Sequence, residues 1–349
     1  MEFHKKARPK VAILLTNSLE TSYGGIGPFV KNLDVHLTDY YELKYFFLPV
    51  KLEKVTLIPH RLIYLVYIFS KYFSLRKFDF IISHSPEGSF VVSTFKLPFV
   101  HVFHGNDNPV SMSRFWYGKY FIAVFDYIAK TIATNSLISY TVGNEVDGRK
   151  KILNPISHGY AVKHSDAKSG FIFAGRLESG KRIDRIIDAY ALLPEAIRTH
   201  NTFKIAGKGS KYGCLKDKIV ALGLEDQVKL IGNLDNQSLI AEISSTKILL
   251  MASEFEGFPM AIAEALSVGV PVVSTSVGDI PSFIVDGENG VLLEKDFVDE
   301  DYRNGIERVL ADYDRFSTNA YKSGKLFDAE KITRDLVGDL EQLLHPVSN

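Results

Sequence analysis

Short apolar runs separated by amphipathic segments recur along this chain, and they restrict its fold more than any other feature of the sequence. Apolar runs of about four to eight residues are typical of parallel strands that are buried on both faces of a sheet. The first series of candidate strands covers residues 11–15, 43–50, 78–83, 98–104 and 131–135. The second covers residues 170–175, 202–207, 228–232, 247–252, 270–275 and 290–294. Strands that alternate with helices in this way predict an α/β fold with two doubly wound parallel sheets.

The length of the chain agrees with two domains. One hydrophobic core rarely organises more than about 250 to 300 residues, and this chain has 349. The stretch 154–169 separates the two series, is rich in His, Gly, Ser and Lys, and has no helical or strand period. We therefore expect an N-terminal domain over residues 1–160 and a C-terminal domain over residues 161–328. Past Val298 the sequence predicts helices.

Composition narrows the class of protein. Hydrophobic residues make up 46% and charged residues 23%, which is typical of a soluble globular protein. The formal net charge is zero, so nothing in the overall charge favours a nucleic-acid partner. The single cysteine, Cys214, excludes an intramolecular disulfide framework and fits a reducing compartment. Residues 1–10 lack the apolar core of a signal peptide, and the most apolar window, 62–69, is too short to span a membrane, so a cytoplasmic location is expected.

The stretch 253–290 carries the strongest indication of chemistry. Two carboxylates, Glu256 and Glu264, bracket a Gly-Phe-Pro turn that leads into a helix of small residues. Pro259 suits the first helical turn, because the N–H that proline lacks would have no partner there. The N–H groups that remain at this helix start, together with the helix dipole, favour an anionic or hydroxyl-rich ligand.

The spacing of the two glutamates restricts what they can do together. Eight helical steps would separate their backbones by about 12 Å. A pair that acts as acid and base on one glycosidic bond needs carboxyl groups about 5 to 9.5 Å apart. Glu256 and Glu264 are therefore interpreted as contacts to two ends of one elongated ligand. The alternative is a surface loop residue and a solvated helix residue, but the register of the surrounding glycines, the proline and the next strand favours a binding site.

This segment resembles the retaining glycosyltransferases of family 4, which belong to the glycosyl transferases group 1. Their pattern is E-G-F-P/G, a second Glu seven residues on, and A-x-G-x-P-V-V, which corresponds here to residues 256–259, Glu264 and residues 267–273. The resemblance implies the GT-B fold, in which two Rossmann-like domains face each other across a cleft. It also implies that Glu256 contacts the donor sugar and Glu264 the ribose of the nucleotide. The intervening donor-binding residues would be Gly257, Phe258, Pro259 and Met260.

One part of the motif departs from the family. Relatives often continue G-G-x-P-E, whereas this chain has Gly278, Asp279 and, at the acidic position, Ser282. The turn is kept, but any sugar or phosphate contact usually made there is in question. The resemblance further implies that the C-terminal domain binds the nucleotide sugar, that the N-terminal domain binds the acceptor, and that a last helix, at about residues 329–349, packs back on the N-terminal domain.

A basic turn follows the first strand of the second series. Gly175, Arg176 and Leu177 match the family's G-R-L, and Lys181 matches the lysine of its Lys-Gly pair, while Arg182 replaces the glycine. By resemblance, Arg176 and Lys181 grip the donor diphosphate. Two cations at a strand end can neutralise the negative charge of a leaving diphosphate. A solvated basic turn is the alternative, and the downstream glutamates favour the functional role.

Further donor contacts follow from the resemblance. The Gly24-Gly25 turn would place Gly25 under the diphosphate, and His104, at a strand end, would lie near the donor sugar and the acceptor. Base recognition would use the backbone of Gly232, Asn233 and Leu234. A glycine turn often serves geometry alone, and a lone histidine is more often structural. His84 ends the preceding strand in a similar position.

Segments 60–78 and 113–130 interleave aromatic residues with Arg and Lys and hold almost no acid. Such helices suit a membrane interface, because Tyr and Trp favour the boundary and cations favour anionic headgroups. The alternative is a pair of core helices with snorkelling cations. In a family whose acceptors are often lipid-linked, the pattern predicts peripheral membrane contact on the N-terminal domain.

We expect neither a metal nor a cofactor. The two D-x-D strings, at residues 299–301 and 312–314, lie in the polar helical tail, and no His/Cys cluster has zinc spacing. The nucleotide sugar would be a substrate, and a UDP-sugar is favoured.

The sequence therefore predicts a metal-independent retaining glycosyltransferase of the hexosyl type. It would move sugar from a nucleotide-diphosphate sugar to a glycan or lipid-linked acceptor in cell-surface polysaccharide assembly, at the inner face of the cell membrane. Three alternatives stay open: a sugar phosphorylase of the same fold, a nucleotide-sugar epimerase, and a non-catalytic partner that binds nucleotide sugar and steadies another transferase. Phosphate-dependent release of sugar would reveal the phosphorylase, and conversion of the donor without an acceptor would reveal the epimerase. Failure to bind any nucleotide sugar would favour the non-catalytic partner.

Overall fold

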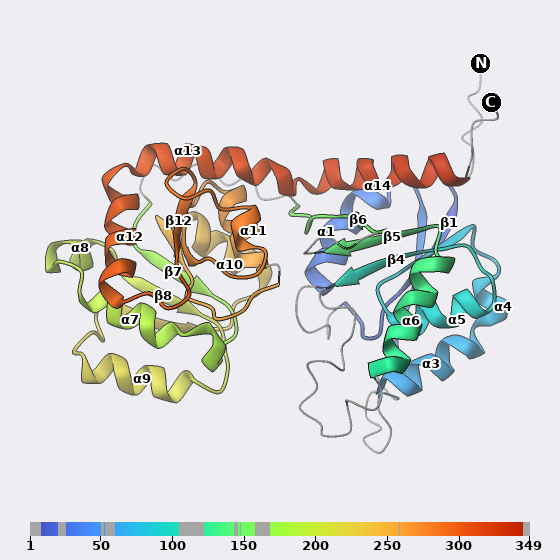
Figure 1. Cartoon of the computed structure of the whole chain (residues 1–349), viewed down its shortest axis with the longest axis horizontal. Coiled ribbons are helices and arrows are strands. Elements are labelled where there is room, and N and C mark those ends of the chain that lie inside the picture. The colour runs from blue at the N-terminus through green and yellow to red at the C-terminus, as the bar shows by residue number, and fades with distance from the viewer. Residues whose placement is uncertain are drawn as a thin grey trace. The chain divides into compact units, whose positions relative to one another are not determined.

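The computed structural model describes residues 8–19, 26–49, 52, 60–104, 122–142, 146, 148–157, 168–257 and 259–344. The chain divides into two compact units. Unit 1 comprises residues up to Ser157 together with Ala329 onward, and unit 2 comprises His158–Asp328. Each unit contains one six-stranded sheet whose strands are all parallel, and both are drawn in Figure 1. The predicted α/β class with two doubly wound sheets is confirmed.

Unit 1 has the strand order β2-β1-β3-β4-β5-β6. Its strands are β1 (Lys10–Leu14), β2 (Glu42–Phe46), β3 (Phe80–Ser83), β4 (Phe99–His104), β5 (Ile138–Val142) and β6 (Lys150–Lys151). Its helices are α1 (Ile26–Leu37), α3 (His60–Ser70), α4 (Tyr72–Leu75), α5 (Pro86–Thr94), α6 (Ile122–Asn135) and α14 (Ala329–Leu344). The buried side chains of α3, α4, α5 and α6 share one core with β1, β3 and β4, while α1 packs against α14 (Figure 1).

One predicted strand is wrong. Residues 131–135 form the last turns of α6, and the strand of this region is β5, which begins at Ile138. The helix accommodates its threonines because the hydroxyl groups of Thr131 and Thr134 donate hydrogen bonds to the carbonyl oxygens four residues earlier, at 2.7 and 2.9 Å. The strand is instead made by Ile138–Val142, whose last four residues are buried.

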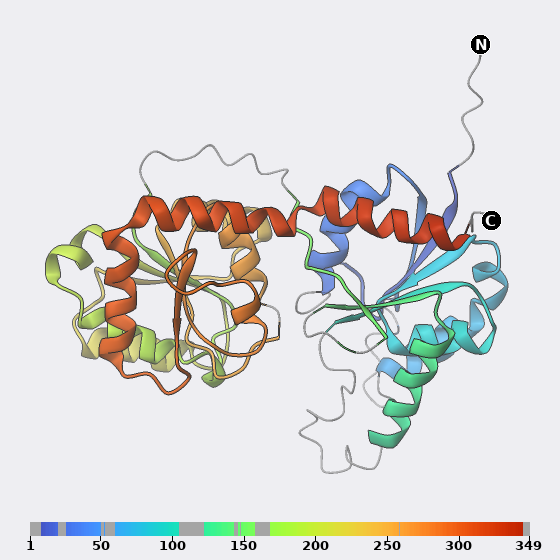
Figure 2. The same cartoon turned by 45° about the horizontal axis from the view of Figure 1, so that its top comes forward.

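Helix α14 completes unit 1, although it is separated in sequence from the rest of that unit by all of unit 2. Its buried residues Ile332, Leu336, Val337 and Leu340 recur at helical spacing, which produces an apolar stripe. Helix α14 packs along α1, as Figure 2 shows from a second direction. At the far end of α14, the carboxylate of Asp339 accepts hydrogen bonds from Tyr140 Oη and Lys150 Nζ.

Unit 2 has the strand order β12-β11-β10-β7-β8-β9. Its strands are β7 (Phe171–Ala174), β8 (Phe203–Ala206), β9 (Val228–Gly232), β10 (Ile248–Leu250), β11 (Val272–Thr275) and β12 (Gly290–Leu293). Its α-helices are α7 (Ile183–Ala191), α8 (Glu195–His200), α9 (Tyr212–Ala221), α10 (Asn236–Ser244), α11 (Met260–Ser267), α12 (Asp299–Ala311) and α13 (Tyr313–Gly324). Short 3₁₀ turns lie at η2 (Ser179–Lys181), η3 (Ile280–Ser282) and η4 (Lys325–Phe327).

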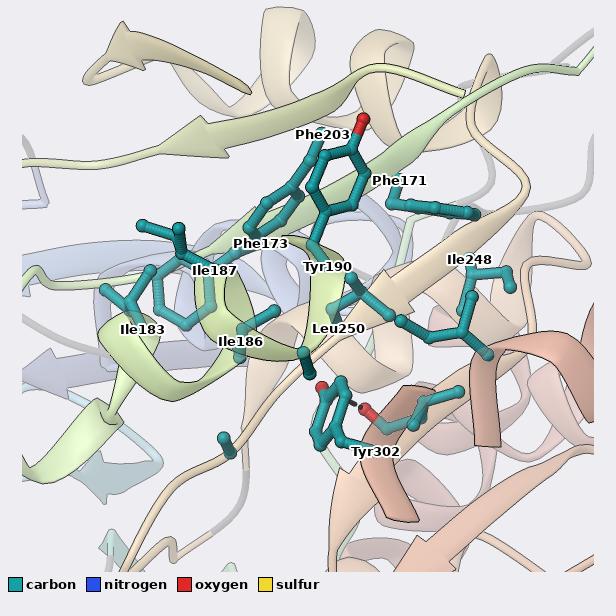
Figure 3. Close-up of a cluster of buried hydrophobic side chains, with 14 of the residues drawn as sticks. Phe171, Phe173, Ile183, Ile186, Ile187, Tyr190, Phe203, Ile248, Leu250 and Tyr302 are labelled. Carbon is teal, nitrogen blue, oxygen red and sulfur yellow. Dashed lines mark hydrogen bonds between the residues drawn. The ribbon is translucent and has the colours of Figure 1, made fainter. Parts of the chain in front are cut away.

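The main core of unit 2 lies between its sheet and the helices α7, α9 and α12. Figure 3 shows Phe171, Phe203, Leu250 and Tyr190 packed together in this core. Tyr302 of α12 is fully buried, and its hydroxyl donates to the carbonyl oxygens of Met251 and Val273, at 2.9 and 3.1 Å. These bonds hold the end of β10 against its neighbour β11, so the loop that leaves β10 starts from a fixed point.

Candidate functional site

The strand order of unit 2 defines where a ligand is expected to bind. The chain winds outward from β7 to β9 in one direction, then returns and winds from β10 to β12 in the other, so β7 and β10 are neighbours with outgoing connections that diverge. Open α/β sheets bind ligands outside the carboxyl ends of the strands at such a switch point. The loop after β7 carries Arg176 and Lys181, and the loop after β10 carries Glu256. Three predicted site residues therefore come from the two strands that flank the switch point.

Lys181 and Glu256 form an ion pair across this switch point. Lys181 Nζ donates to Glu256 Oε1, and the Lys181 and Glu256 side chains are 20% and 9% exposed. Ser253, which is fully buried, donates its hydroxyl to the same carboxylate oxygen at 2.7 Å. Both donors bind Oε1, and no described residue is seen to bind Oε2. The carboxylate is thus held by one oxygen while the other is available to a ligand. Ser253 was not predicted from the sequence.

Arg176 lies exposed at the end of β7. Within the described part of the chain its guanidinium forms neither a hydrogen bond nor an ion pair. A cation without a carboxylate partner at a switch point is suited to an anionic ligand, because its charge is not already compensated. Lys181 is the second cation of this edge of the sheet, and its charge is compensated by Glu256.

Arg182 occupies the position at which the family carries glycine, and its backbone explains that preference. Its φ and ψ are 47° and 41°, in the left-handed region that glycine adopts without steric penalty. The arginine is held there by its side chain, whose Nε donates to the carbonyl oxygen of Ala252 and whose Nη2 donates to that of Lys295, both at 2.7 Å. Arg182 is therefore a structural brace between the β7 and β10 loops rather than a free cation.

Glu264 is the second carboxylate of the motif, and it is buried in α11 with 5% of its surface exposed. Its carboxyl group forms no hydrogen bond or ion pair with any residue that the structure describes. Burial raises its pKa to about 7, because desolvation disfavours the charged form. A buried carboxyl group without a protein partner is rare in folded proteins and calls for an explanation, of which a ligand is the most direct.

The start of α11 lies one residue later than the sequence predicts. Pro259 is the N-cap, with φ −77° and ψ 110°, and Met260 is the first helical residue. Pro259 forms no side-chain capping hydrogen bond, and of the first-turn N–H groups that of Ile262 donates to the Pro259 carbonyl oxygen at 3.0 Å. Gly257 is exposed just before it, and Phe258 lies outside the described residues.

The turn at Gly278 contacts the Glu256 loop directly. Gly278 has φ +57°, and a Cβ atom at this position would lie 1.7 Å from the carbonyl oxygen of Glu256. Asp279, which replaces a family glycine, is buried. Ser282 is exposed at the end of η3. The departure from the family pattern therefore keeps the glycine on which the position of Glu256 depends.

Three glycines lie side by side where β7, β8 and β9 end. Gly207 N donates to the carbonyl oxygen of Gly232 at 2.7 Å, and a Cβ atom on Gly207 would lie 1.8 Å from the carbonyl oxygen of Gly175. Gly207 was not predicted, and it is the residue through which the predicted Gly175 and Gly232 approach each other. Asn233 and Leu234 follow the end of β9, two strand spacings or about 10 Å from β7. Together these residues extend the candidate site along the sheet edge.

His104 lies in unit 1, at the end of β4, and has a partner that the sequence only suggested. Its Nε2 lies 2.8 Å from Nδ1 of His84, which follows β3, and its ring packs edge-on against Phe29 of α1. Burial lowers the pKa of His104 to about 3, and burial together with the neighbouring His104 lowers the pKa of His84 well below its usual value. Both rings are therefore neutral at physiological pH. Gly25 lies outside the described residues.

The acidic strings of the helical tail are used within the fold. Asp299 pairs with Arg185 at 2.8 Å, Asp301 accepts from the Val298 N–H at 3.2 Å, and Asp312 pairs with Arg315. Among the described residues, no group of three or more His, Cys, Asp and Glu side chains is arranged to hold a metal ion. In the same part of the chain no helix has the length and apolar character needed to cross a membrane.

Comparison with known proteins finds similarity to one family. Residues 160–323 match the family described as glycosyl transferases group 1. An uncharacterized glycosyltransferase of Methanocaldococcus jannaschii is 25% identical over 213 residues, which are 60% of this chain and 57% of that protein. The chain spans between 23% and 57% of the length of such curated relatives.

Solved structures show the likeness over nearly the whole chain. Sucrose-phosphate synthase from Thermosynechococcus elongatus superposes with a TM-score of 0.74 at 17% identity, covering 98% of this chain and all of that one. Anabaena HepE in complex with UDP-glucose gives a TM-score of 0.69 at 17% identity, covering 96% of this chain and all of that one. At this identity the likeness concerns the fold, and it confirms the predicted GT-B class. Over residues 160–323, in its second unit, the chain is thus similar to the glycosyl transferases group 1 family.

Proposed function

We propose that this protein is a retaining glycosyltransferase that takes its sugar from a nucleotide-diphosphate sugar bound by unit 2. The observation that carries the proposal is the set of charged groups at the β7–β10 switch point. Among the described residues, Arg176 has no carboxylate partner there, Lys181 and Glu256 are paired, and the buried Glu264 carboxyl has no hydrogen-bond partner. A nucleotide-diphosphate sugar has a complementary group for each of them.

The parts of the donor match the parts of the site in order. The diphosphate suits Arg176, Lys181 and the uncapped start of α11, because all three offer positive charge or free N–H groups. The sugar hydroxyl groups suit the second oxygen of Glu256. The ribose hydroxyl groups suit the carboxyl of Glu264, and the base would extend toward Gly232, Asn233 and Leu234. A UDP-sugar is the favoured donor, supported by the UDP-glucose that the HepE structure contains.

The chemistry proposed for this site is front-face transfer. The bond between the sugar C1 and the diphosphate oxygen breaks, and the acceptor oxygen bonds to C1 on the same face. The acceptor proton passes to the leaving phosphate oxygen, so no separate protein base is required. Arg176 and Lys181 stabilise the negative charge that develops on the diphosphate, which replaces the role of a metal ion. The acceptor would be a glycan or lipid-linked sugar of cell-surface polysaccharide assembly.

The test is a thermal-shift panel of UDP-, GDP-, ADP- and dTDP-glucose with the wild type and the variants Arg176→Ala and Glu264→Gln. We expect stabilisation by one nucleotide class, reduced in both variants. Lys216→Ala, a lysine of the exposed face of α9, is the matched cation control and keeps the wild-type shift. No shift with any donor would overturn the proposal and favour a non-catalytic partner.

The class of reaction is tested separately with the donor that binds. NMR of the product should show the anomeric configuration of the donor, and transfer should be unchanged by EDTA. A product of inverted anomeric configuration would contradict the proposal that the enzyme is retaining. Loss of transfer with EDTA would contradict the proposal that it is metal-independent. Phosphate-dependent sugar release would identify a phosphorylase, and donor conversion without acceptor an epimerase.

A further inference from the structure

One face of the helices α3 and α4 presents large apolar side chains to solvent. Helix α3 buries Tyr64 and Ile68 against the core of unit 1. On its opposite side and in α4, Leu62, Val66, Phe69 and Phe73 are 53%, 61%, 57% and 77% exposed. The spacing of four and three residues places Leu62, Val66 and Phe69 on one face of α3, and Phe73 follows in α4. We call these four residues the α3–α4 stripe.

The stripe is bordered by positive charge. Residues 60–78 contain Arg61, Lys71, Arg76 and Lys77 and no Asp or Glu. Arg61 pairs with Glu87 at 3.2 Å, whereas Lys71, Arg76 and Lys77 form no ion pair with a described carboxylate. Lys71 Nζ lies 5.2 Å from the ring centre of Tyr67, and the Arg76 guanidinium lies 5.6 Å from that of Tyr72. Lys71 and Arg76 thus lie beside aromatic rings, and within the described part of the chain no carboxylate pairs with Lys71, Arg76 or Lys77.

We propose that the α3–α4 stripe docks on the surface of an anionic lipid bilayer. Exposed Leu, Val and Phe side chains can enter the acyl boundary, while Lys and Arg along the edge meet anionic headgroups. Protein–protein interfaces, in contrast, are depleted in lysine. The charge of the stripe's border is therefore complementary to a lipid surface of negative charge. This inference depends on unit 1 alone and does not rest on the proposed sugar transfer.

The structure also sharpens the sequence prediction of a membrane-contacting surface. Of the second predicted segment, 113–130, residues 113–121 lie outside the described part of the chain. In its described part Val124 and Tyr127 of α6 are exposed. The stripe itself lies on α3 and α4, and the aromatic residues Tyr64 and Phe78 of the first segment are buried or half-buried instead. Only part of the aromatic content of segment 60–78 is therefore available to lipid.

The experiment is cosedimentation of the full chain with vesicles of phosphatidylcholine, or of phosphatidylcholine and phosphatidylglycerol in a three-to-one ratio. We compare the wild type with Phe69→Ser/Phe73→Ser and with Lys71→Gln/Lys77→Gln. The control is Val220→Ser/Leu326→Ser, which removes apolar residues of 53% and 54% exposure from unit 2. We expect binding to the anionic vesicles, a loss of about tenfold or more in partition coefficient for each stripe variant, and no change for the control.

Three outcomes would overturn the proposal. The wild type does not bind anionic vesicles, the Phe variant binds them as well as the wild type, or neutral vesicles bind equally well and without dependence on salt. Sedimentation velocity can give a fourth outcome that overturns the proposal. If the wild type dimerises and the Phe variant is monomeric, the stripe is a contact between two copies of the chain. Unchanged circular dichroism and an unchanged nucleotide-sugar thermal shift in the stripe variants separate failure of docking from failure of folding or donor binding.

Discussion

Gly278 lies directly against the carbonyl oxygen of Glu256: a Cβ atom on residue 278 would lie 1.7 Å from it. The turn after β11 therefore determines where the backbone of the β10 loop can lie. Because that loop also presents the Glu256 carboxylate to Lys181, the conformation of residue 278 and the position of the candidate sugar-binding group are coupled.

Gly278→Ala should weaken donor binding more than its backbone strain alone can explain. The matched control is Gly223→Ala, because Gly223 has a similar φ of +65° and open space around its Cβ position. We expect Gly223→Ala to lower the free energy of unfolding by about 1 to 2 kcal/mol, the usual cost of a left-handed residue, without changing the donor-induced thermal shift. Gly278→Ala should lower the stability further and abolish the shift. Equal effects of the two variants in denaturant unfolding and thermal shift would contradict the coupling.

Glu264→Gln should stabilise the protein at alkaline pH while weakening donor binding. The folded-state pKa of Glu264 is raised from 4.5 to about 7, so the wild type loses stability as pH rises through this interval. Glutamine does not titrate. The free energy of unfolding of Glu264→Gln should therefore exceed that of the wild type by an amount that grows between pH 5 and 8, to at most about 3 kcal/mol. Urea unfolding at pH 5 and pH 8 measures the change. A constant difference between variant and wild type at the two pH values would show that Glu264 is not desolvated as described.

Asp34 provides the comparison for Glu264, because it is also buried but lies in α1 of unit 1. Burial raises its pKa from 3.8 to about 6 although Tyr45 donates a hydrogen bond to it. Asp34→Asn should therefore gain stability relative to the wild type between about pH 4 and pH 6, and keep the full donor-induced shift. Loss of the donor-induced thermal shift in Asp34→Asn would mean that removing a buried carboxyl group outside the motif also affects donor binding, so that the effect of Glu264→Gln would not be specific.

At position 182 glycine should be tolerated better than alanine. Arg182→Ala loses the hydrogen bonds to Ala252 and Lys295 and keeps the left-handed backbone, whereas Arg182→Gly loses the same bonds and relieves the backbone. We expect the glycine variant to be more stable than the alanine variant by about 1 kcal/mol in chemical denaturation. Elsewhere alanine is usually the more stable of the two, so the reversed order is diagnostic.

His104→Gln should reduce the acid sensitivity of the fold. The folded-state pKa of His104 is depressed to about 3, so the unfolded chain binds the proton first, and stability is lost as pH falls below 6.5. At pH 5 this amounts to about 2 kcal/mol for His104. The difference in unfolding free energy between pH 7 and pH 5 should shrink in the variant by that amount.

The strands of unit 2 could be predicted from sequence because each is a short apolar run with helices on both sides. The segment 131–135 could not, because the threonine hydroxyl groups satisfy their hydrogen bonds inside a helix, which no strand propensity takes into account. Strand β6, which is two residues long, is too short to leave a periodic pattern.

The candidate site could be predicted as far as its motifs reach. Arg176, Lys181 and Glu256 were identified in sequence, but their meeting at the switch point depends on strand order, which is not a local property. Ser253 and Gly207 were missed because a buried serine and a strand-end glycine are common residues that acquire a role only through contacts across loops. One feature of the sequence indicated the left-handed backbone of Arg182: relatives carry glycine at this position, and glycine adopts that conformation easily.

The return of α14 to unit 1 has a consequence for how the chain is made. Unit 2 is one continuous stretch, so it has all of its residues as soon as Asp328 leaves the ribosome. Unit 1 is translated first but cannot cover the apolar side of α1 until Ile332, Leu336 and Leu340 have been synthesised. The half of the protein that is encoded first is therefore the half that finishes folding last, and a nascent chain that stalls within unit 2 leaves unit 1 exposed to chaperones and proteases.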